Sequence, residues 1–216
     1  VDGILERVLQ EVDERTTLIV MSDHGFAPFY RAVHLENWLA ENGYLELYGS
    51  GPPAGKKLQE DVDWSRTKAY ALGFNGIYLN LFGRDPAGIV TPREKAALLE
   101  EISKKLLVWR DPAGGRQVVA RTYLPEEIYS GPHAAEAPDL IVGYSRGYRA
   151  SWDTPIGRLG PALIEDNVDA WSGDHLMAAE LVPGIILSNR PLRKGEPSLV
   201  DLPVTILDLF GIERPA

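Results

Sequence analysis

The stretch Thr16-Thr17-Leu18-Ile19-Val20-Met21-Ser22-Asp23-His24-Gly25-Phe26 joins a short apolar run to a carboxylate and an imidazole. Residues 17–21 are apolar or β-branched, a pattern that predicts a buried strand. Asp23 and His24 follow at the carboxyl end of this strand, which is where open α/β sheets bind ligands. Gly25 permits a sharp turn close to a ligand. Because Asp and His together suit a metal ion such as zinc, we expect a metal site here.

Composition limits the classes of function that the chain can have. Its 216 residues, 44% of them hydrophobic, are enough for one or two domains with a real core. The net charge of −9 argues against a surface that follows a nucleic-acid backbone. A small anionic substrate stays possible, since a bound dication reverses the local field. There is no cysteine, which excludes disulfides and thiolate metal sites, and no apolar run approaches the ~20 residues of a membrane span.

The order of the predicted elements indicates an α/β fold with an inserted α+β section. Thr91, Pro92 and Glu94 form the capping box of the clearest helix start. We divide the chain into a core segment with the metal-ligand strand (1–48), an inserted α+β subdomain (49–135) and a return to the core sheet with a C-terminal helix (136–216). Helices are expected at 2–14, 35–42, 92–108 and 199–210, the third with Ala97, Leu98, Ile102 and Leu106 inward. Strands are expected at 17–21, 68–72, 76–82, 117–122, 139–144 and 184–188, and 145–172 reads as irregular.

A second candidate segment is Trp171-Ser172-Gly173-Asp174-His175. Gly173 permits close approach to a ligand, but a loop histidine is more often structural, so His175 is a metal ligand only if it converges on Asp23 and His24 in space. Asp174 is either a ligand or an acceptor that orients an imidazole, and we favour an outer or structural role. Four further polar residues are interpreted as structural, with His34 and His133 in capping or surface positions, Asp139 in a turn and Asp201 as a helix N-cap.

Beyond these residues, the sequence resembles the alkaline phosphatase superfamily, in particular its type I phosphodiesterase/nucleotide pyrophosphatase branch. Ser22-Asp23-His24-Gly25-Phe26 and Trp171-Ser172-Gly173-Asp174-His175 are the specific matches. Supporting matches are Leu35-Glu36-Asn37-Trp38-Leu39, Asn42-Gly43-Tyr44-Leu45, Asp63-Trp64-Ser65-Arg66-Thr67-Lys68-Ala69-Tyr70, Gly83-Arg84-Asp85-Pro86-Ala87-Gly88-Ile89-Val90, Ala137-Pro138-Asp139-Leu140 and Val182-Pro183-Gly184.

The resemblance implies the C-terminal part of an alkaline-phosphatase-like sheet flanked by helices, in a two-metal hydrolase of small phosphoester or nucleotide substrates. It gives Asp23 and His24 to one metal and His175 to the other, with Asp174 beside the ligands or the substrate. Zinc is the expected metal, and manganese and iron also accept His and carboxylate. Such a pair of metals clamps the attacking and leaving oxygens of phosphoryl transfer.

One departure from the family pattern is important. The family's Thr or Ser nucleophile, its neighbouring Asp and an Asp-x-x-x-His pair lie before the Ser-Asp-His-Gly strand, whereas residues 1–22 contain no histidine. We therefore expect no catalytic nucleophile in this chain and little or no activity from it alone. Two alternatives stay open, namely another superfamily hydrolase (phosphomonoesterase, sulfatase or phosphoglycerate-mutase-like) and a non-catalytic module that binds metal or a partner. An open sheet edge would favour a dimer, and the composition fits a soluble bacterial protein of the cytoplasm or an exported one.

Overall fold

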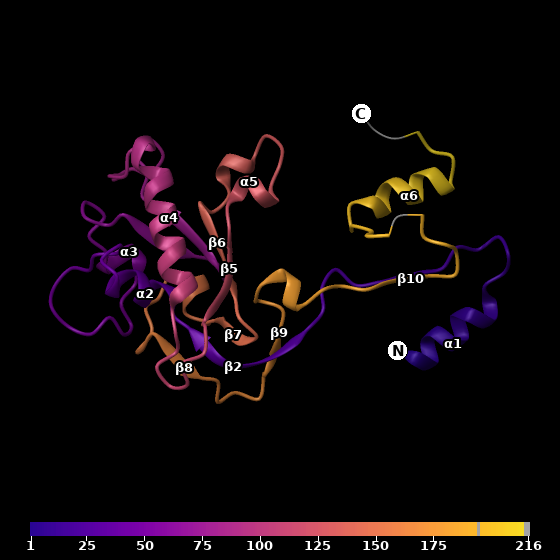
Figure 1. Ribbon diagram of the computed structural model, residues 1–216, viewed down its shortest axis with the longest axis horizontal. Helices are drawn as coiled ribbons and strands as arrows, with labels where there is room; N and C mark the ends of the chain where they lie inside the picture. Colours follow the sequence, from indigo (N-terminus) through magenta and orange to yellow (C-terminus); the bar gives the residue numbers. More distant parts are fainter. Residues whose placement is uncertain (194, 214–216) are drawn as a thin grey trace. The chain divides into compact units, whose positions relative to one another are not determined.

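The computed structural model describes residues 1–193 and 195–213 and divides the chain into two compact units. Unit 1 combines Val1–Gly25 with Pro183–Ala216, and unit 2 is Phe26–Val182. Both contain helices and strands, so the chain has the mixed α/β composition that the sequence predicts (Figure 1). The boundaries predicted at residues 48 and 135 separate an inserted subdomain from the two parts of a larger core sheet, and they stay a prediction.

Unit 1 is a two-stranded ribbon with two helices. Strand β1 (Ile19–Met21) pairs antiparallel with β10 (Ile186–Ser188), and α1 (Asp2–Glu11) and α6 (Asp201–Leu209) complete the unit. All four elements were predicted. The expected burial of residues 17–21 is wrong, however: they are half-buried or exposed, because β1 pairs with β10 alone among the described strands and the described part of unit 1 has no buried residue. Asp201 is the first residue of α6 and follows the N-cap, Val200.

Unit 2 contains two four-stranded sheets. The first has the order β3-β4-β6-β5 and is antiparallel throughout. In the second, β2 lies between β7 and β8 and also pairs with β9. The strands of these sheets are β2 (Ala27–Val33), β3 (Ala69–Leu72), β4 (Gly76–Leu79), β5 (Val119–Tyr123), β6 (Leu140–Tyr144), β7 (Gly147–Ala150), β8 (Ile164–Asp166) and β9 (Gly173–Asp174).

None of the four strands of the second sheet was predicted from the sequence, since β2 and β9 also lie outside the predicted strand ranges. Residues 145–172 read as irregular, yet they contain β7 and β8. β7 pairs parallel with β2, and β8 pairs antiparallel with it. Both strands are short, and all four residues of β7 are buried, so β7 shows no alternation of polar and apolar side chains. Long-range pairing with β2 therefore defines these strands.

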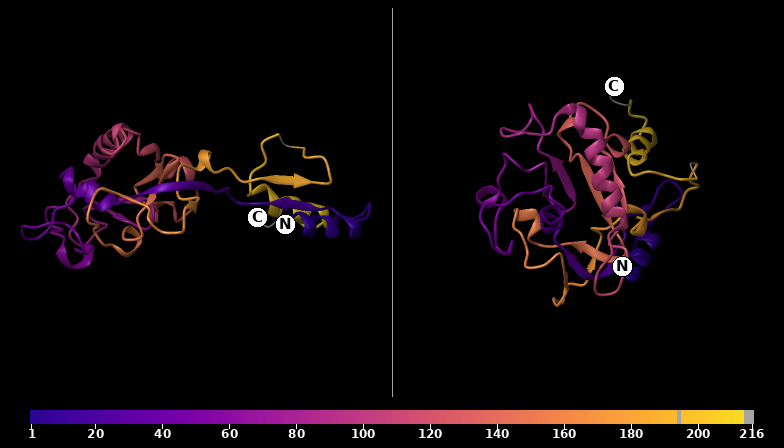
Figure 2. Two further views of the ribbon diagram at one scale, coloured as in Figure 1. Left: turned by 90° about the horizontal axis from the view of Figure 1, so that it is seen from below. Right: turned by 60° about the vertical axis from the view of Figure 1, so that its left-hand side comes forward.

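Helix α4 (Pro92–Val108) covers the first sheet of unit 2 and lies along β5 (Figures 1 and 2). Its capping box forms as predicted, with the Thr91 backbone N–H donating to Glu94 Oε2 at 3.0 Å. Ile102 and Leu106 are buried as expected, but the third buried position is Leu99 and Ala97 is exposed. The other helices of unit 2 are α2 (Leu35–Glu41), α3 (Leu58–Asp61) and α5 (Pro125–Ile128), with 3₁₀ turns η1 (Ala134–Glu136), η2 (Thr154–Ile156) and η3 (Ala179–Leu181).

A buried carboxylate ties the first sheet to α4. Asp139 precedes β6 and accepts hydrogen bonds from the Leu79 backbone N–H (2.9 Å), Arg84 Nη2 (2.8 Å) and Lys95 Nζ (2.6 Å). Burial alone raises the pKa of Asp139, but the bonds from Arg84, Lys95 and Leu79 outweigh it and hold the pKa below its ordinary value. The prediction of a simple turn residue understated its role, because all three partners lie at least 44 positions away.

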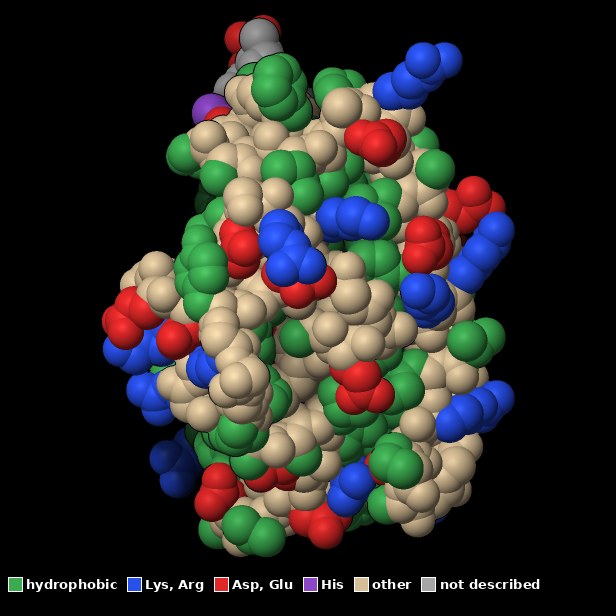
Figure 3. Space-filling view, turned by 90° about the vertical axis from the view of Figure 1, so that its left-hand side faces the viewer, with side chains coloured by type: hydrophobic (Ala, Val, Ile, Leu, Met, Phe, Trp, Pro, Cys, Tyr) green, Lys and Arg blue, Asp and Glu red, His purple; other side chains and the backbone are tan. Residues whose placement is uncertain are grey.

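The charged side chains of unit 2 are mixed on the face shown in Figure 3, where acidic and basic groups alternate. This face carries no broad basic area. Within the described part of the chain, no helix is long and apolar enough to cross a membrane.

Candidate metal-binding residues

Asp23 and His24 lie in unit 1, two and three residues after β1. The Ser22 backbone continues the pairing with the opposite chain segment, since its N–H donates to the Ile185 carbonyl at 3.0 Å. The pairing then ends, and the Asp23 side chain is 66% exposed while that of His24 is 31% exposed. A strand end therefore presents a carboxylate and an imidazole to solvent, as the sequence predicted.

The imidazole of His24 has a defined orientation. Its Nδ1 lies 2.9 Å from the Gly25 carbonyl oxygen, which can only accept a hydrogen bond. The Nδ1 atom therefore carries a proton, and the other ring nitrogen, Nε2, lies 3.7 Å from Asp23 Oδ2. Histidine ligands of metal ions commonly have this arrangement, with one ring nitrogen donating to a backbone carbonyl.

A glycine allows the neighbouring chain to approach the Asp23 backbone. A Cβ atom on Gly184 would lie 2.3 Å from the Ser22 carbonyl oxygen and 3.1 Å from that of Asp23. No larger residue fits without moving one of the two segments. Beside this contact lies a cavity of about 380 Å³ that Asp23 helps to line, together with Met21, Ser22 and Pro183–Ile186.

Asp174 and His175 lie in unit 2, at the end of β9. The Asp174 side chain is 6% exposed and that of His175 is 42% exposed. Asp174 Oδ1 accepts hydrogen bonds from the backbone N–H groups of His175 (2.7 Å) and Leu176 (3.2 Å), and it lies 3.4 Å from His175 Nδ1. The edge of the His175 ring faces Phe26, with ring centroids 5.6 Å apart. Asp174 thus accepts hydrogen bonds from the turn that carries His175, and its role beside a metal stays a prediction.

The sequence did not indicate that a buried arginine contacts Asp174. Arg149 is 1% exposed, and its Nε lies 2.9 Å from Asp174 Oδ2. Tyr144, which interacts electrostatically with Arg149 and with Glu36, has a buried Oη without a hydrogen-bond partner, and Glu36 Oε1 also has none. Burial raises the pKa of Glu36 to about 8. Arg149 lies in a segment that was predicted to be irregular, so nothing in the local sequence indicates that its side chain is buried.

The two remaining histidines do not resemble metal ligands. His133 is exposed as predicted and its Nδ1 lies 2.7 Å from Glu136 Oε1. The capping position expected for His34 is confirmed but the surface position is wrong, because this side chain is fully buried and its Nε2 lies 2.5 Å from Glu165 Oε2. Its backbone is the N-cap of α2, but its side chain makes no capping bond. Long-range packing under β8 buries it, and nothing in the local sequence indicates this.

The structure keeps the predicted ligands in two sets. Asp23 and His24 lie together in unit 1, whereas Asp174 and His175 lie together in unit 2. Over residues 1–193 and 195–213, no group of three or more His, Asp or Glu side chains is arranged to hold a metal ion. The donor types, imidazole nitrogen and carboxylate oxygen, do fit zinc. Each unit by itself therefore holds a carboxylate and an imidazole of types that zinc accepts, and their binding of a metal stays a prediction.

Comparison with known families identifies one match. The family model for type I phosphodiesterase/nucleotide pyrophosphatase matches residues 1–155. The chain belongs to this family. The match includes the Ser22–Phe26 segment and ends before Asp174 and His175. Comparisons with curated proteins and with solved structures give no match.

Proposed function

We propose that this phosphodiesterase/pyrophosphatase family member supplies part of the two-metal site of an enzyme that hydrolyses small phosphoesters or nucleotides. The observation that carries the proposal is the Asp23-His24 pair at a strand end, with His24 Nδ1 held by the Gly25 carbonyl. The family match includes this segment.

Within this proposal each residue has one task. Asp23 and His24 bind one metal ion, and His175 binds the other, with zinc as the metal. Bound metal supplies Lewis-acid stabilisation of charge on the phosphoryl oxygens and lowers the pKa of a water molecule. Asp174 orients the segment that carries His175 through the two backbone N–H groups that it accepts. The chain itself contributes no nucleophile.

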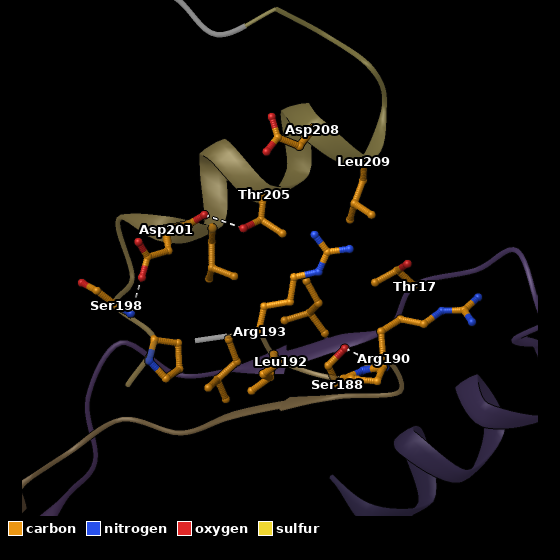
Figure 4. Close-up of a pocket in the computed structure, with 15 residues that line it drawn as sticks. Thr17, Ser188, Arg190, Leu192, Arg193, Ser198, Asp201, Thr205, Asp208 and Leu209 are labelled. Atoms are coloured by element: carbon orange, nitrogen blue, oxygen red, sulfur yellow. Dashed lines mark hydrogen bonds between the residues drawn. The ribbon is translucent and has the colours of Figure 1, made fainter. Parts of the chain in front are cut away.

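The packing of unit 1 supports the view that this chain is one part of a larger catalytic domain. Figure 4 shows open space between α6 and the β1–β10 ribbon, a cavity of about 670 Å³. Exposed apolar side chains remain on both elements, including Leu187 (56% exposed) and Leu209 (56% exposed). An α/β layer normally buries such side chains against a further layer. We propose that additional polypeptide with the nucleophile completes this core.

Self-association through the ribbon is a second candidate. β1 and β10 pair only with each other among the described strands, so each has an open edge. Sedimentation equilibrium of the chain between micromolar and near-millimolar concentrations decides this point. A dimer that Leu187→Lys disrupts supports self-association, whereas a monomer throughout that range excludes it.

Zinc calorimetry tests the metal-binding part of the proposal. Wild-type chain and Asp23→Ala are titrated with zinc, and His133→Ala serves as the control because His133 is an exposed histidine outside both ligand sets. We expect binding in the wild type and the control, and binding at least ~10-fold weaker in Asp23→Ala. Equal affinities in all three proteins would contradict the proposal.

Hydrolysis of a nitrophenyl phosphodiester tests the claim that the nucleophile lies elsewhere. The purified chain with zinc is expected to give no rate above that of the Asp23→Ala variant. Robust turnover by the wild-type chain alone, lost in Asp23→Ala, would support metal-dependent hydrolysis and overturn the claim of incompleteness.

A further inference from the structure

Arg149 occupies an unusual position for a charged side chain. It lies in β7, is 1% exposed, and its guanidinium carbon lies 3.9 Å from the centroid of the Trp152 ring and 5.2 Å from that of Phe29. Its Nη2 has no hydrogen-bond partner, and its Nε meets Asp174 as an ion pair rather than as an aligned hydrogen bond. Removing such a charge from water is costly, so the fold retains Arg149 at the expense of stability.

The partner of Arg149 is the residue that shapes the His175 turn. Asp174 Oδ2 lies 2.9 Å from Arg149 Nε, and its Oδ1 accepts the backbone N–H groups of His175 and Leu176. One carboxylate therefore joins a buried cation on β7 to the turn that follows β9. Both strands belong to the sheet around β2, which fixes their separation.

We propose that Arg149 is a positioning residue for His175, acting through Asp174. The guanidinium holds the Asp174 carboxylate in place, and Asp174 in turn fixes the backbone and ring of His175. This inference rests on the proposed function only where it concerns metal affinity. The proposed effect of Arg149 on the orientation of the His175 ring does not depend on metal binding.

The sheet offers a matched control. Arg31 on β2 also makes an ion pair with a buried aspartate, Asp111, at 2.9 Å between Nε and Oδ2. Asp111 is followed by a turn, as Asp174 is, since it accepts the Ala113 backbone N–H at 2.9 Å. Among the described residues, the other side-chain partners of this pair are Asp166, beside Arg31, and Tyr148, beside Asp111, and neither is a histidine. Arg31→Met therefore reports the general effect of breaking a buried ion pair in this sheet.

The test observes the four histidine rings of the full, metal-free chain by long-range ¹H–¹⁵N correlation at pH 8, with single His→Gln variants for assignment. We expect one narrow set of His175 signals in the wild type and in Arg31→Met. In Arg149→Met the His175 signals are expected to broaden or to move toward those of a freely rotating imidazole. If Arg149→Met fails to fold, Arg149→Lys replaces it, with a smaller change in the same direction.

Unchanged His175 signals in a folded Arg149 variant, or equal changes in Arg31→Met, would overturn the inference. Zinc affinity is a second readout, expected to fall ~10- to 100-fold in Arg149→Met and by less than ~3-fold in Arg31→Met. Absence of zinc binding in the wild type would count against the proposed function, whereas the metal-free spectra would still decide the role of Arg149.

Discussion

At the residue scale, the predicted ligands differ in how firmly the structure holds them. His24 is oriented by one hydrogen bond to its neighbour Gly25, while His175 follows a carboxylate that is itself bound to a buried guanidinium. The sequence identified the donors from their residue types and flanking glycines. It could not reveal Arg149, because its contact with Asp174 spans 25 positions and depends on pairing within a sheet.

Gly184 is expected to be essential for the Asp23 segment. In Gly184→Ala the added Cβ collides with the Ser22 carbonyl oxygen, and such overpacking costs ~1–3 kcal/mol. The Ser22 amide, which donates to Ile185, should then exchange its hydrogen at least several-fold faster. Gly173→Ala is the matched control, since a Cβ there meets nothing within 4 Å. Equal exchange rates in wild type and Gly184→Ala would contradict the close approach.

Glu36 is expected to make the stability of the chain depend on pH. Its pKa is raised by burial to about 8 from an ordinary value of 4.5. Between these values the unfolded chain has lost this proton and the folded chain keeps it, so rising pH favours unfolding by up to ~1.4 kcal/mol per pH unit. Glu36→Gln should remove this slope. Urea denaturation at pH 5, 6, 7 and 8 measures it, and parallel curves for the two proteins would refute it.

At the element scale, helices marked by local sequence features were predicted, whereas short strands that depend on long-range pairing were missed. The capping box at Thr91 located the start of α4, and the Gly and Pro residues around 145–172 concealed β7 and β8. The residues of a helix cap are close together in the sequence, so caps can be predicted from it. Short buried strands take their hydrogen bonds from distant partners such as β2, and their sequences carry little trace of it.

Asp139 is expected to join α4 to the first sheet energetically as well as geometrically. Asp139→Asn removes the charge that Arg84 and Lys95 face, and should lower the free energy of unfolding by ~2–4 kcal/mol at pH 7. The exposed pair Lys104–Glu100 on the same helix is the control, and Glu100→Gln should leave the free energy of unfolding almost unchanged.

The effect of Asp139 should also depend on pH with a definite sign. Because the pKa of Asp139 is lowered in the folded chain, its stabilisation is complete above the ordinary value of 3.8 and is lost as pH falls through the folded value. The difference between wild type and Asp139→Asn should therefore shrink below about pH 4. A constant difference down to pH 2 would show that the charge is not responsible.

At the scale of the whole molecule, the two units differ in how completely they are packed. Unit 2 has a buried core on its first sheet, with Ile77, Leu79 and Leu140 almost inaccessible. The described residues of unit 1 include none that is buried. The sequence predicted the elements of unit 1 but expected a buried strand there, because apolar composition alone does not show which neighbours are present.

Hydrogen exchange should reveal this difference directly. Local opening is easiest where few apolar contacts hold an element. The amides of β1 and β10 are therefore expected to exchange far faster than those of β4 and β6 in the same sample. Comparable protection in both units at low protein concentration would show that the β1–β10 ribbon is stable by itself, and would weaken the proposal that further polypeptide covers it.

The central claim is that Asp23-His24 and His175 bind metal while the other histidines do not. A zinc titration of the full chain, followed on all four histidine side chains by ¹H–¹⁵N correlation, tests it most directly. We predict that the ring signals of His24 and His175 shift with zinc, and that those of buried His34 and of His133 beside Glu136 stay in place. Shifts confined to His133, or no shift at His24 at saturating zinc, would contradict the account.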